Sequence, residues 1–276
     1  MVAQNIALPN LRKLFIPDPG YLSAECDLSG ADAQVVAWEA DDADLKAAFR
    51  AGLKLHIKNS RDLFPEKTKD LTDAELKAQD HPGGIYHDIK RAVHGTNYGG
   101  SAWALATIIK WPVSRAEEFQ ERWFFLHPGI KEWHRRTERW LNGSQCWRCN
   151  TLVTEALPRC TKCNASLGRT VRNAFGYRRI YFDRIDGLLP EALAWVPQST
   201  VAINTERGML LVEETYPFLQ ILLQVHDSIV FQIPKSYRHI LPDIQSTLNT
   251  VITPYPDPLQ IPWGLASSDK SWGDCV

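Results

Sequence analysis

The chain has 276 residues, 44% of them hydrophobic, which is enough to bury one large core or two small ones. Its formal net charge is −1, so the bulk charge does not indicate a nucleic-acid partner. No apolar run approaches the ~20 residues of a membrane span, and no stretch has the pattern of a signal peptide. We therefore expect no membrane partner and a cytoplasmic location.

The first half of the chain is predicted to be mostly helical. The pattern of residues 21–27 predicts a strand, which Gly30 ends. Helices are predicted over 31–40, around Leu45 to Phe49, once within the loop-rich stretch 62–84, from Tyr86 to about Thr107, from Ser114 to Pro128 and over 130–141. Two of these helices have a capping-box signal, Thr72-x-x-Glu75 and Ser114-x-x-Glu117.

The second half is predicted to be mixed. Residues 142–168 break the helical pattern, and 171–182 resemble a hairpin or turn. A helix over 188–214 precedes strands over 219–225 and 228–233, with His226-Asp227 between them as in a tight hairpin. An amphipathic helix runs through Leu241, Ile244, Leu248 and Val251. The order of elements predicts an α+β fold, with an antiparallel sheet backed by helices.

Two cysteine pairs predict a metal site. Cys146-x-x-Cys149 and Cys160-x-x-Cys163 are separated by ten residues, and each CxxC is typical of a tight metal-binding knuckle. Four thiolates fit one tetrahedral structural Zn²⁺, with an iron–sulfur cluster as the alternative. Metal-binding rather than disulfide-bonded cysteines indicate a reducing compartment.

Charge is also concentrated around these cysteines. Residues 131–180 hold eleven Lys/Arg and three Asp/Glu. Such a segment in an otherwise acidic chain indicates a phosphate-facing surface, although a solvated charged face is the alternative.

Two isolated aspartates predict a second metal site. Asp27 ends the first strand and Asp227 lies between two apolar strands, where a carboxylate is costly unless it is paired or bound to metal. Hairpins commonly place such acids side by side at one sheet edge, and two carboxylates can share two Mg²⁺ ions. Turn-forming aspartates are the alternative.

A polar stripe follows the predicted helix after Tyr86. Tyr86, Lys90, His94 and Tyr98 recur every four residues, so they share one helix face that is not a core face. Lys90 can hold phosphates as a point charge, and Tyr98 can stack on any base. An ordinary exposed amphipathic face is the alternative.

Three segments together resemble motifs A, B and C of the family A DNA polymerases, the bacterial polymerase I class. They are Asp27-Leu28-Ser29-Gly30, the run from Tyr86 to Gly100, and Gln224-Val225-His226-Asp227. The resemblance implies that Asp27 and Asp227 are catalytic and bind two Mg²⁺ ions, with the carbonyl of Leu28 as a further ligand. It implies a dNTP site that consists of Lys90, His94, Tyr98, Asp32 and Tyr86.

The chain departs from the family pattern at four of these positions. Asp32 stands where the family usually has Glu as a steric gate against ribose, and Ser228 stands where many members have a second acid. Tyr86 occupies the place of an Arg that contacts phosphate, and His94 replaces an aromatic residue.

Other segments extend the resemblance over most of the chain. Residues 173–179, which end in Arg178-Arg179, look like the family's Phe-Gly-Arg-Arg-Arg hairpin, and 197–200 look like its Gln-Gly-Thr segment. The resemblance implies that Gln198 reads the minor groove, that His226 lies near the primer terminus, and that Arg178 and Arg179 bind DNA. The stretch 269–273 resembles the family C-terminus.

These resemblances give an expected organisation and function. We expect palm over 1–61, fingers over 62–127, a helix returning to the palm over 128–141, a zinc-binding insert over 142–168 and palm again over 169–276, with thumb and exonuclease domains absent. The expected activity is phage-type, template-directed addition of dNTPs to a primer on DNA, with a separate thumb or exonuclease subunit as a further partner. A non-catalytic zinc-stapled DNA-binding subunit and a single-subunit RNA polymerase relative are the alternatives. The insert is either a folding staple or a basic finger that touches the duplex.

Overall fold

The computed structural model describes residues 9–182, 187–252 and 254–275 and divides into two compact units. The first unit joins Met1–Asp32 to Gln198–Val276, and the second unit is Ala33–Pro197. Residues 33–61 and 169–197, which the sequence groups with the palm, thus pack within the second unit. No helix in the described ranges is long and apolar enough to cross a membrane.

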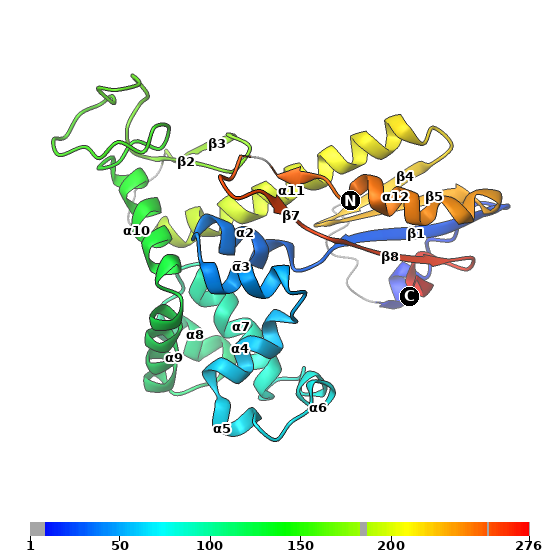
Figure 1. Cartoon of the computed structure of the whole chain (residues 1–276), viewed down its shortest axis with the longest axis horizontal. Helices are drawn as coiled ribbons and strands as arrows, with labels where there is room; N and C mark the ends of the chain where they lie inside the picture. The colour runs from blue at the N-terminus through cyan, green and yellow to red at the C-terminus, as the bar shows by residue number, and fades with distance from the viewer. Residues whose placement is uncertain (1–8, 183–186, 253, 276) are drawn as a thin grey trace. The chain divides into compact units, whose positions relative to one another are not determined.

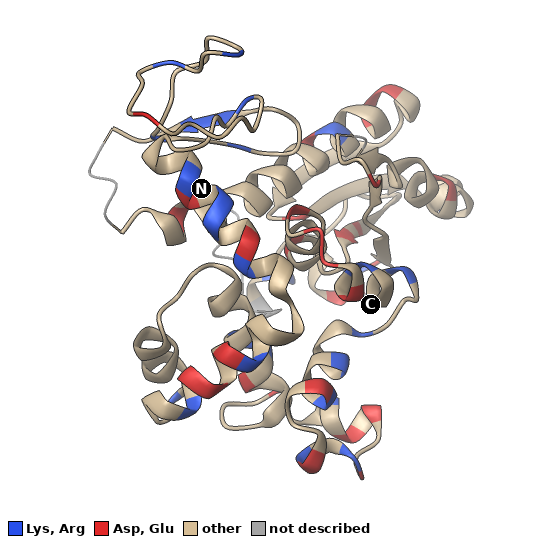
Figure 2. Ribbon diagram, turned by 60° about the vertical axis from the view of Figure 1, so that its left-hand side comes forward, with Lys and Arg blue, Asp and Glu red and all other residues tan. Residues whose placement is uncertain are grey.

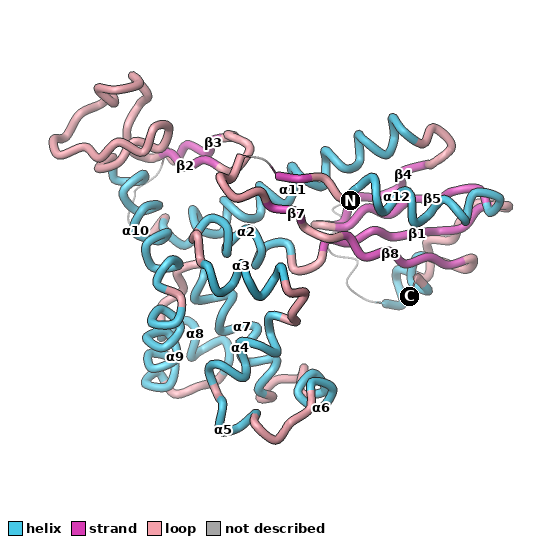
Figure 3. Tube along the Cα trace, in the orientation of Figure 1, coloured by secondary structure: helices cyan, strands magenta, loops and turns pink. Residues whose placement is uncertain are grey.

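The first unit is built on a four-stranded antiparallel sheet in the order β4-β5-β1-β8 (Figure 1; strands are magenta in Figure 3). The strands are β1 Tyr21–Leu28, β4 Gln220–Val225, β5 Ser228–Pro234 and β8 Trp263–Ser268. Apolar and polar residues do not alternate regularly along β1 and β5, because these two central strands are buried on both faces of the sheet. The sheet core includes Leu22, Cys26, Ile229 and Phe231, none of which is exposed to solvent.

The predicted strands of the first unit are confirmed, but β8 is absent from the prediction. Its sequence, Trp-Gly-Leu-Ala-Ser-Ser, has only one residue type of high strand propensity, and its pairing with β1 is what makes it a strand. The last predicted helix is shorter than expected. Helix α12, Leu241–Leu248, ends before Val251, which pairs instead in the two-stranded sheet of β6, Val251–Ile252, and β7, Leu259–Gln260.

Helices form most of the second unit (cyan in Figure 3). They are α2 Ala31–Glu39, which begins in the first unit, α3 Ala43–Arg50, α4 Leu55–Leu63, α5 Pro65–Thr68, α6 Asp73–Ala78, α7 Ile85–Asn97, α8 Ala102–Ile109, α9 Val113–Leu126 and α10 Pro128–Asn142. Helix α11, Leu189–Thr215, carries Pro197 at the boundary between the two units. The short elements α1 Pro9–Arg12, η2 Lys235–Ile240 and η3 Trp272–Asp274 belong to the first unit.

The helix predicted from Tyr86 to Thr107 is wrong, because two helices with a break between them occupy this stretch. Gly99 has a φ of +73°, a left-handed conformation that a side chain disfavours. A Cβ on Gly100 would also lie 2.9 Å from the carbonyl oxygen of Gly95. Ser101 then starts α8 by accepting a hydrogen bond from the amide of Ala104.

Capping signals have mixed success as predictors. The box at Thr72 and Glu75 is confirmed at the start of α6, where each side chain bonds the other residue's amide. The cap at Ser114 is wrong, since Pro112 precedes the first turn of α9.

The prediction of one short helix in 62–84 is also wrong, because α5 and α6 both lie there.

The hairpin predicted after the cysteine pairs is confirmed. Strands β2 Thr170–Arg172 and β3 Arg178–Ile180 pair antiparallel. The preceding stretch, 142–168, contains only two isolated bridges, Gln145 with Leu152 and Arg159 with Ser166. An observed mixture of helices and antiparallel sheet confirms the expected fold class.

Candidate active site

The sheet of the first unit brings Asp27 and Asp227 together. Asp27 is near the end of β1 and pairs with Ser228 at the start of β5, while Asp227 is the second residue of the two-residue β4–β5 loop. The amide of Leu28 donates to the carbonyl oxygen of Asp227 at 3.1 Å. Two residues that are 200 positions apart in the chain are therefore neighbours at one end of the sheet.

An open cavity of about 460 Å³ lies over these aspartates. It is formed by residues of all four strands, by the β4–β5 loop and by Arg12 of α1, so the unpredicted strand β8 supplies one wall. The lining residues are Arg12, Glu25, Asp27, Val225, His226, Asp227, Ser228, Gly264, Leu265 and Ala266. The cavity thus has three carboxylates, those of Glu25, Asp27 and Asp227, together with Arg12 and His226.

The surroundings of the two carboxyl groups raise the free-energy cost of ionising each of them. Loss of hydration and, to a smaller extent, the charges of Asp227 and Glu25 raise the pKa of Asp27 to about 6, against the opposing effect of Arg12. Desolvation likewise raises the pKa of Asp227, with Asp32 and Glu25 adding to the shift. Such a concentration of negative charge favours a divalent cation, because the cation would remove the repulsion.

Asp27→Asn is expected to stabilise the protein in buffer without added Mg²⁺. The folded-state pKa of Asp27 is about 6 against an ordinary value of 3.8, so the folded state retains a proton that the unfolded chain releases between these values. The free energy of unfolding therefore falls as pH rises through this window, and the amide removes that penalty. After allowance for solvent screening at an exposed side chain, we expect a gain of about 1 kcal/mol at pH 7.5 and about half of it at pH 5.

Urea unfolding at the two pH values measures this gain. The matched control is Asp70→Asn, which changes an exposed turn carboxylate in the second unit. A gain at Asp27 that is equal at both pH values, or no greater than that of the control, would contradict the electrostatic origin.

Glu25 is a third carboxylate of the site, and the sequence analysis missed it. It lies two residues before Asp27, so both side chains leave β1 on the same face. Its Oε1 is 3.0 Å from the hydroxyl of Ser228 and 3.8 Å from the guanidinium of Arg12. Arg12 in turn lies over the ring of Trp272 at 4.5 Å. The sequence signal that could have identified Glu25 is its spacing of two residues from Asp27 on a predicted strand.

His226 is placed by a left-handed backbone. Its φ is +55°, in a two-residue hairpin loop where a residue of this conformation joins two twisted strands. For a residue other than Gly this costs about 1–2 kcal/mol. The side chain is exposed next to Asp227 and lines the cavity.

The stripe on α7 belongs to the second unit and faces solvent as predicted. Lys90 and His94 are exposed, and Tyr86 and Tyr98 are half-buried. The rings of His94 and Tyr98 meet edge to face with centroids 4.4 Å apart. Buried hydrogen bonds fix α7 against the residues that follow it, because Asp88 accepts from Trp111 at 3.0 Å and Asn97 accepts from Trp123 at 2.9 Å.

The other predicted site residues are distributed over both units. Asp32 is in the first turn of α2, and its charge reaches Asp227. Gln198 is exposed on α11 directly after Pro197. Arg178 and Arg179 are on β3, where Arg179 pairs with Glu191.

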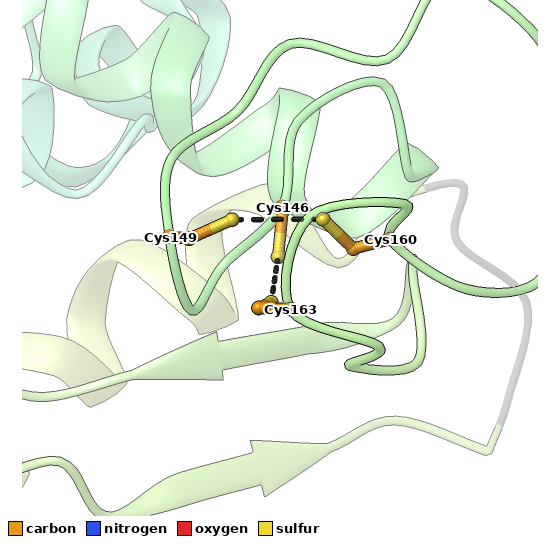
Figure 4. Close-up of side chains that lie close together, drawn as sticks. All are labelled: Cys146, Cys149, Cys160 and Cys163. Atoms are coloured by element: carbon orange, nitrogen blue, oxygen red, sulfur yellow. Dashed lines mark hydrogen bonds between the residues drawn. The ribbon is translucent and has the colours of Figure 1, made fainter.

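The four predicted cysteine ligands converge (Figure 4). All four Sγ atoms lie within 4.8 Å of one another, with Cys146 and Cys163 3.6 Å apart and Cys149 and Cys160 3.5 Å apart. A regular tetrahedron with metal–sulfur distances of about 2.3 Å has sulfur–sulfur edges of about 3.8 Å. The cysteines are free rather than disulfide-bonded, so this geometry fits a tetrahedral zinc ion.

Both knuckles of the cluster have the same local structure. The amide of Asn150 donates to the carbonyl oxygen of Cys146, and that of Asn164 donates to Cys160, each at 2.9 Å. Both asparagines have a positive φ, a conformation that Asn tolerates better than most residues. The sequence thus builds two equivalent turns, each of which presents two sulfur atoms.

A second group of metal-ligand types has another explanation. Asp42, Asp44 and His127 lie together, but Asp42 caps α3 and bonds His127 at 3.2 Å, while Asp44 pairs with Lys58 at 2.6 Å. Structural hydrogen bonds therefore account for this group.

A comparison with known proteins agrees with the geometry of the aspartates. The sequence profile of DNA polymerase family A matches residues 3–272. The chain belongs to DNA polymerase family A. Among curated members, it is 27% identical over 271 residues to DNA polymerase I of Helicobacter pylori (strain J99), and 28% identical over 230 residues to DNA polymerase I of Geobacillus stearothermophilus.

These family A relatives are much longer than the chain. The alignments cover 96% and 82% of the chain but 26% and 23% of the two relatives, so the chain spans about a quarter of their length. The fold is also similar to that of a solved structure. The POL domain of Pol1 from M. smegmatis, in complex with DNA primer-template and dNTP, superimposes over 99% of the chain with a TM-score of 0.76 at 20% identity, and the match covers 44% of that structure.

Proposed function

We propose that the chain is the catalytic core of a template-directed DNA polymerase, which adds dNTPs to a primer 3′-hydroxyl. The observation that carries this proposal is the pairing of Asp27 with Asp227 beneath an open cavity, in a chain that belongs to family A. Nucleotidyl transfer needs adjacent carboxylates that hold divalent cations, and the raised pKa values of both groups match a site that is completed by such cations.

In this proposal Asp27, Asp227 and the carbonyl of Leu28 hold two Mg²⁺ ions. When bound, the ions supply charge neutralisation at the transferred phosphate and activation of the primer hydroxyl. The protein itself holds the two carboxylates side by side through the β1–β5 register, and it holds Glu25 beside them through Ser228 and Arg12. This preorganisation lowers the cost of assembling the charged site.

The second unit supplies the proposed dNTP contacts. Lys90 and His94 are exposed on α7 next to Tyr98 and Tyr86, an arrangement that suits a triphosphate and a stacked base. Asp32 is the proposed gate toward the sugar. We assign Gln198, His226, Arg178 and Arg179 to DNA, and we propose that the sheet unit is the palm and that the α4–α9 helices belong to the fingers.

The cysteine cluster is proposed to hold one structural zinc ion. Burial raises the pKa of Cys146 to about 12, so its thiolate is costly without a bound cation, and the sulfur geometry fits a tetrahedral ion. A thumb or exonuclease subunit that acts with this chain is a further proposed partner.

Primer extension by the zinc-loaded 276-residue chain tests the activity. With Mg²⁺ and a primer–template, we expect template-directed products from deoxynucleotides and few products from ribonucleotides, since Asp32 retains an acid at the proposed gate. A preference for ribonucleotides would instead support an RNA polymerase. Tight DNA binding without any extension would support a non-catalytic DNA-binding subunit.

A further inference from the structure

The cysteine insert and the β2–β3 hairpin form a continuous basic stretch. Residues 144–182 contain seven Lys/Arg and one Asp/Glu, and blue predominates over red along this part of the ribbon in Figure 2. Five of the seven cations are exposed: Arg148, Arg159, Lys162, Arg169 and Arg178. Such a concentration of exposed cations complements a polyanion.

Four of the five exposed cations have no acidic partner among the described residues: Arg148, Arg159, Lys162 and Arg178 form no ion pair there. Arg179, on the same strand as Arg178, instead pairs with Glu191 and lies over the ring of Tyr181 at 5.0 Å. A solvated face that served only solubility would have mixed charges. The unbalanced charge instead suits an anionic ligand.

Trp147 joins the insert to the hairpin. It follows Cys146 in the first knuckle, is 7% exposed, and donates from Nε1 to the carbonyl oxygen of Ser166, which follows the second knuckle, at 2.9 Å. The guanidinium of Arg178 lies over its ring, 5.3 Å from the centroid. Both knuckles thus fix the ring on which Arg178 rests.

The base of the insert is closed against the hairpin. The amide of Arg169 donates to the carbonyl oxygen of Leu141 at 2.7 Å, and the amide of Tyr181 donates to the carbonyl oxygen of Arg169 at 2.8 Å. Gly143 and Gly168 come so close that a Cβ on Gly143 would lie 3.3 Å from the amide nitrogen of Gly168. The insert is therefore tied to the hairpin at its base as well as through Trp147.

We propose that the insert and the hairpin form one surface that binds the phosphate backbone of duplex primer–template DNA. In this surface Arg148, Arg159 and Lys162 contact phosphates, and Trp147 is a positioning residue that holds Arg178 toward the same ligand. Because contacts with phosphates carry no sequence information, binding through these cations is independent of sequence and depends strongly on salt. The proposal rests on the proposed polymerase function only for the identity of the ligand.

Fluorescence anisotropy with a labelled primer–template tests the surface cations. The triple variant Arg148→Ala/Arg159→Ala/Lys162→Ala is expected to weaken binding about tenfold or more and to reduce the slope of log K against log salt by roughly 2 to 3. The control Lys54→Ala/Lys67→Ala/Lys77→Ala removes three exposed cations outside the insert, one just before α4 and one each on α5 and α6, and should change affinity less than twofold. Zinc content by native mass spectrometry verifies that the insert of each variant is intact.

A double-mutant cycle tests the positioning role of Trp147. Arg178→Ala is expected to weaken binding about tenfold in the wild-type background but less than twofold in Trp147→Leu, whereas Trp147→Phe, which keeps an aromatic face, should retain most of the effect. Equal effects of Arg178→Ala in all backgrounds would overturn this role.

Three outcomes would overturn the proposal that this surface binds duplex DNA. They are unchanged affinity and salt slope in a zinc-loaded triple variant, an equal loss in the control triple variant, and preferential binding of single-stranded DNA that the triple variant does not weaken. These binding results are independent of catalysis, because a failure of the proposed function would appear as absent primer extension by the wild-type protein.

Discussion

Asp27→Ala and Asp227→Ala are each expected to reduce primer extension by roughly 10³-fold or more, which corresponds to about 4 kcal/mol of transition-state stabilisation. One carboxylate comes from β1 and the other from the β4–β5 loop, and both line one cavity from different positions, so neither can replace the other as a ligand. The remaining Glu25 is engaged with Ser228 and Arg12. Single-turnover extension at saturating primer–template and dNTP measures the loss in the rate of the chemical step.

The control for this loss is a carboxylate outside the cavity. Asp70→Ala should extend primers at the wild-type rate, because Asp70 is exposed in a turn of the second unit. Primer–template affinity in the absence of Mg²⁺ should be unchanged or improved in both active-site variants, since removal of a negative charge favours a polyanion. Extension by Asp227→Ala within tenfold of the wild-type rate would contradict the assignment.

Loss of activity in these variants should not arise from unfolding. The Asp27 side chain is exposed, and its carboxylate is destabilised by its surroundings in the absence of metal. Truncation to Ala is therefore expected to leave the thermal midpoint unchanged or to raise it by a few degrees. A structural aspartate that capped a turn would show the opposite sign, with a loss of about 1 kcal/mol.

Local patterns in the sequence were sufficient to predict that Asp27 and Asp227 lie side by side, which the structure places at one end of the sheet. A two-residue polar loop between apolar strands predicts a hairpin, and that hairpin puts Asp227 at its tip. The second strand of the hairpin, β5, pairs with β1 because both strands are buried in one core. A strand as apolar as Ser228–Pro234 has few other possible partners. The solvent-facing stripe on α7 could also be predicted from the sequence, because it depends only on helical periodicity.

The remaining features of the site depend on tertiary contacts that the sequence does not encode locally. Strand β8 has weak strand propensity, and it forms a wall of the cavity because β1 offers an unpaired edge. The role of Glu25 depends on its hydrogen bond to Ser228, a residue 203 positions later in the chain. The break at Gly99 and Gly100 depends on close contacts with Leu193 and Gly95. Because the sequence has helical periodicity on both sides of the break, it predicted one continuous helix.

Removal of the metal is expected to unfold the cysteine insert while the sheet stays folded. Apart from two isolated bridges and a few backbone turns, the described residues of 142–168 have no regular secondary structure, and Cys146 and Cys160 are their buried centre. A structural zinc ion contributes on the order of 10 kcal/mol to such a module, far more than its small apolar core can supply. Cys146→Ser should have the same effect as chelation.

Hydrogen exchange followed by mass spectrometry resolves the two parts of this expectation. Chelation or Cys146→Ser should abolish amide protection over residues 144–168, and protection of the β1 and β5 strands should change little because their core contains no cysteine of the cluster. The control is Cys275→Ser, which alters a half-buried thiol outside the cluster and should leave one zinc ion per chain. Retained protection of the insert in the metal-free protein would show that it folds without the ion.

The same experiment distinguishes a folding staple from a ligand-binding module. If the ion serves only to close the insert, its loss should leave the affinity for primer–template unchanged. Arg178, however, rests on Trp147, and Trp147 is fixed by a hydrogen bond between the two knuckles, so unfolding of the knuckles releases the guanidinium. We therefore expect metal removal to weaken DNA binding at least as much as Trp147→Leu does. In the metal-free protein, Arg178→Ala should then have less than a twofold further effect, because the contact that it removes is already lost.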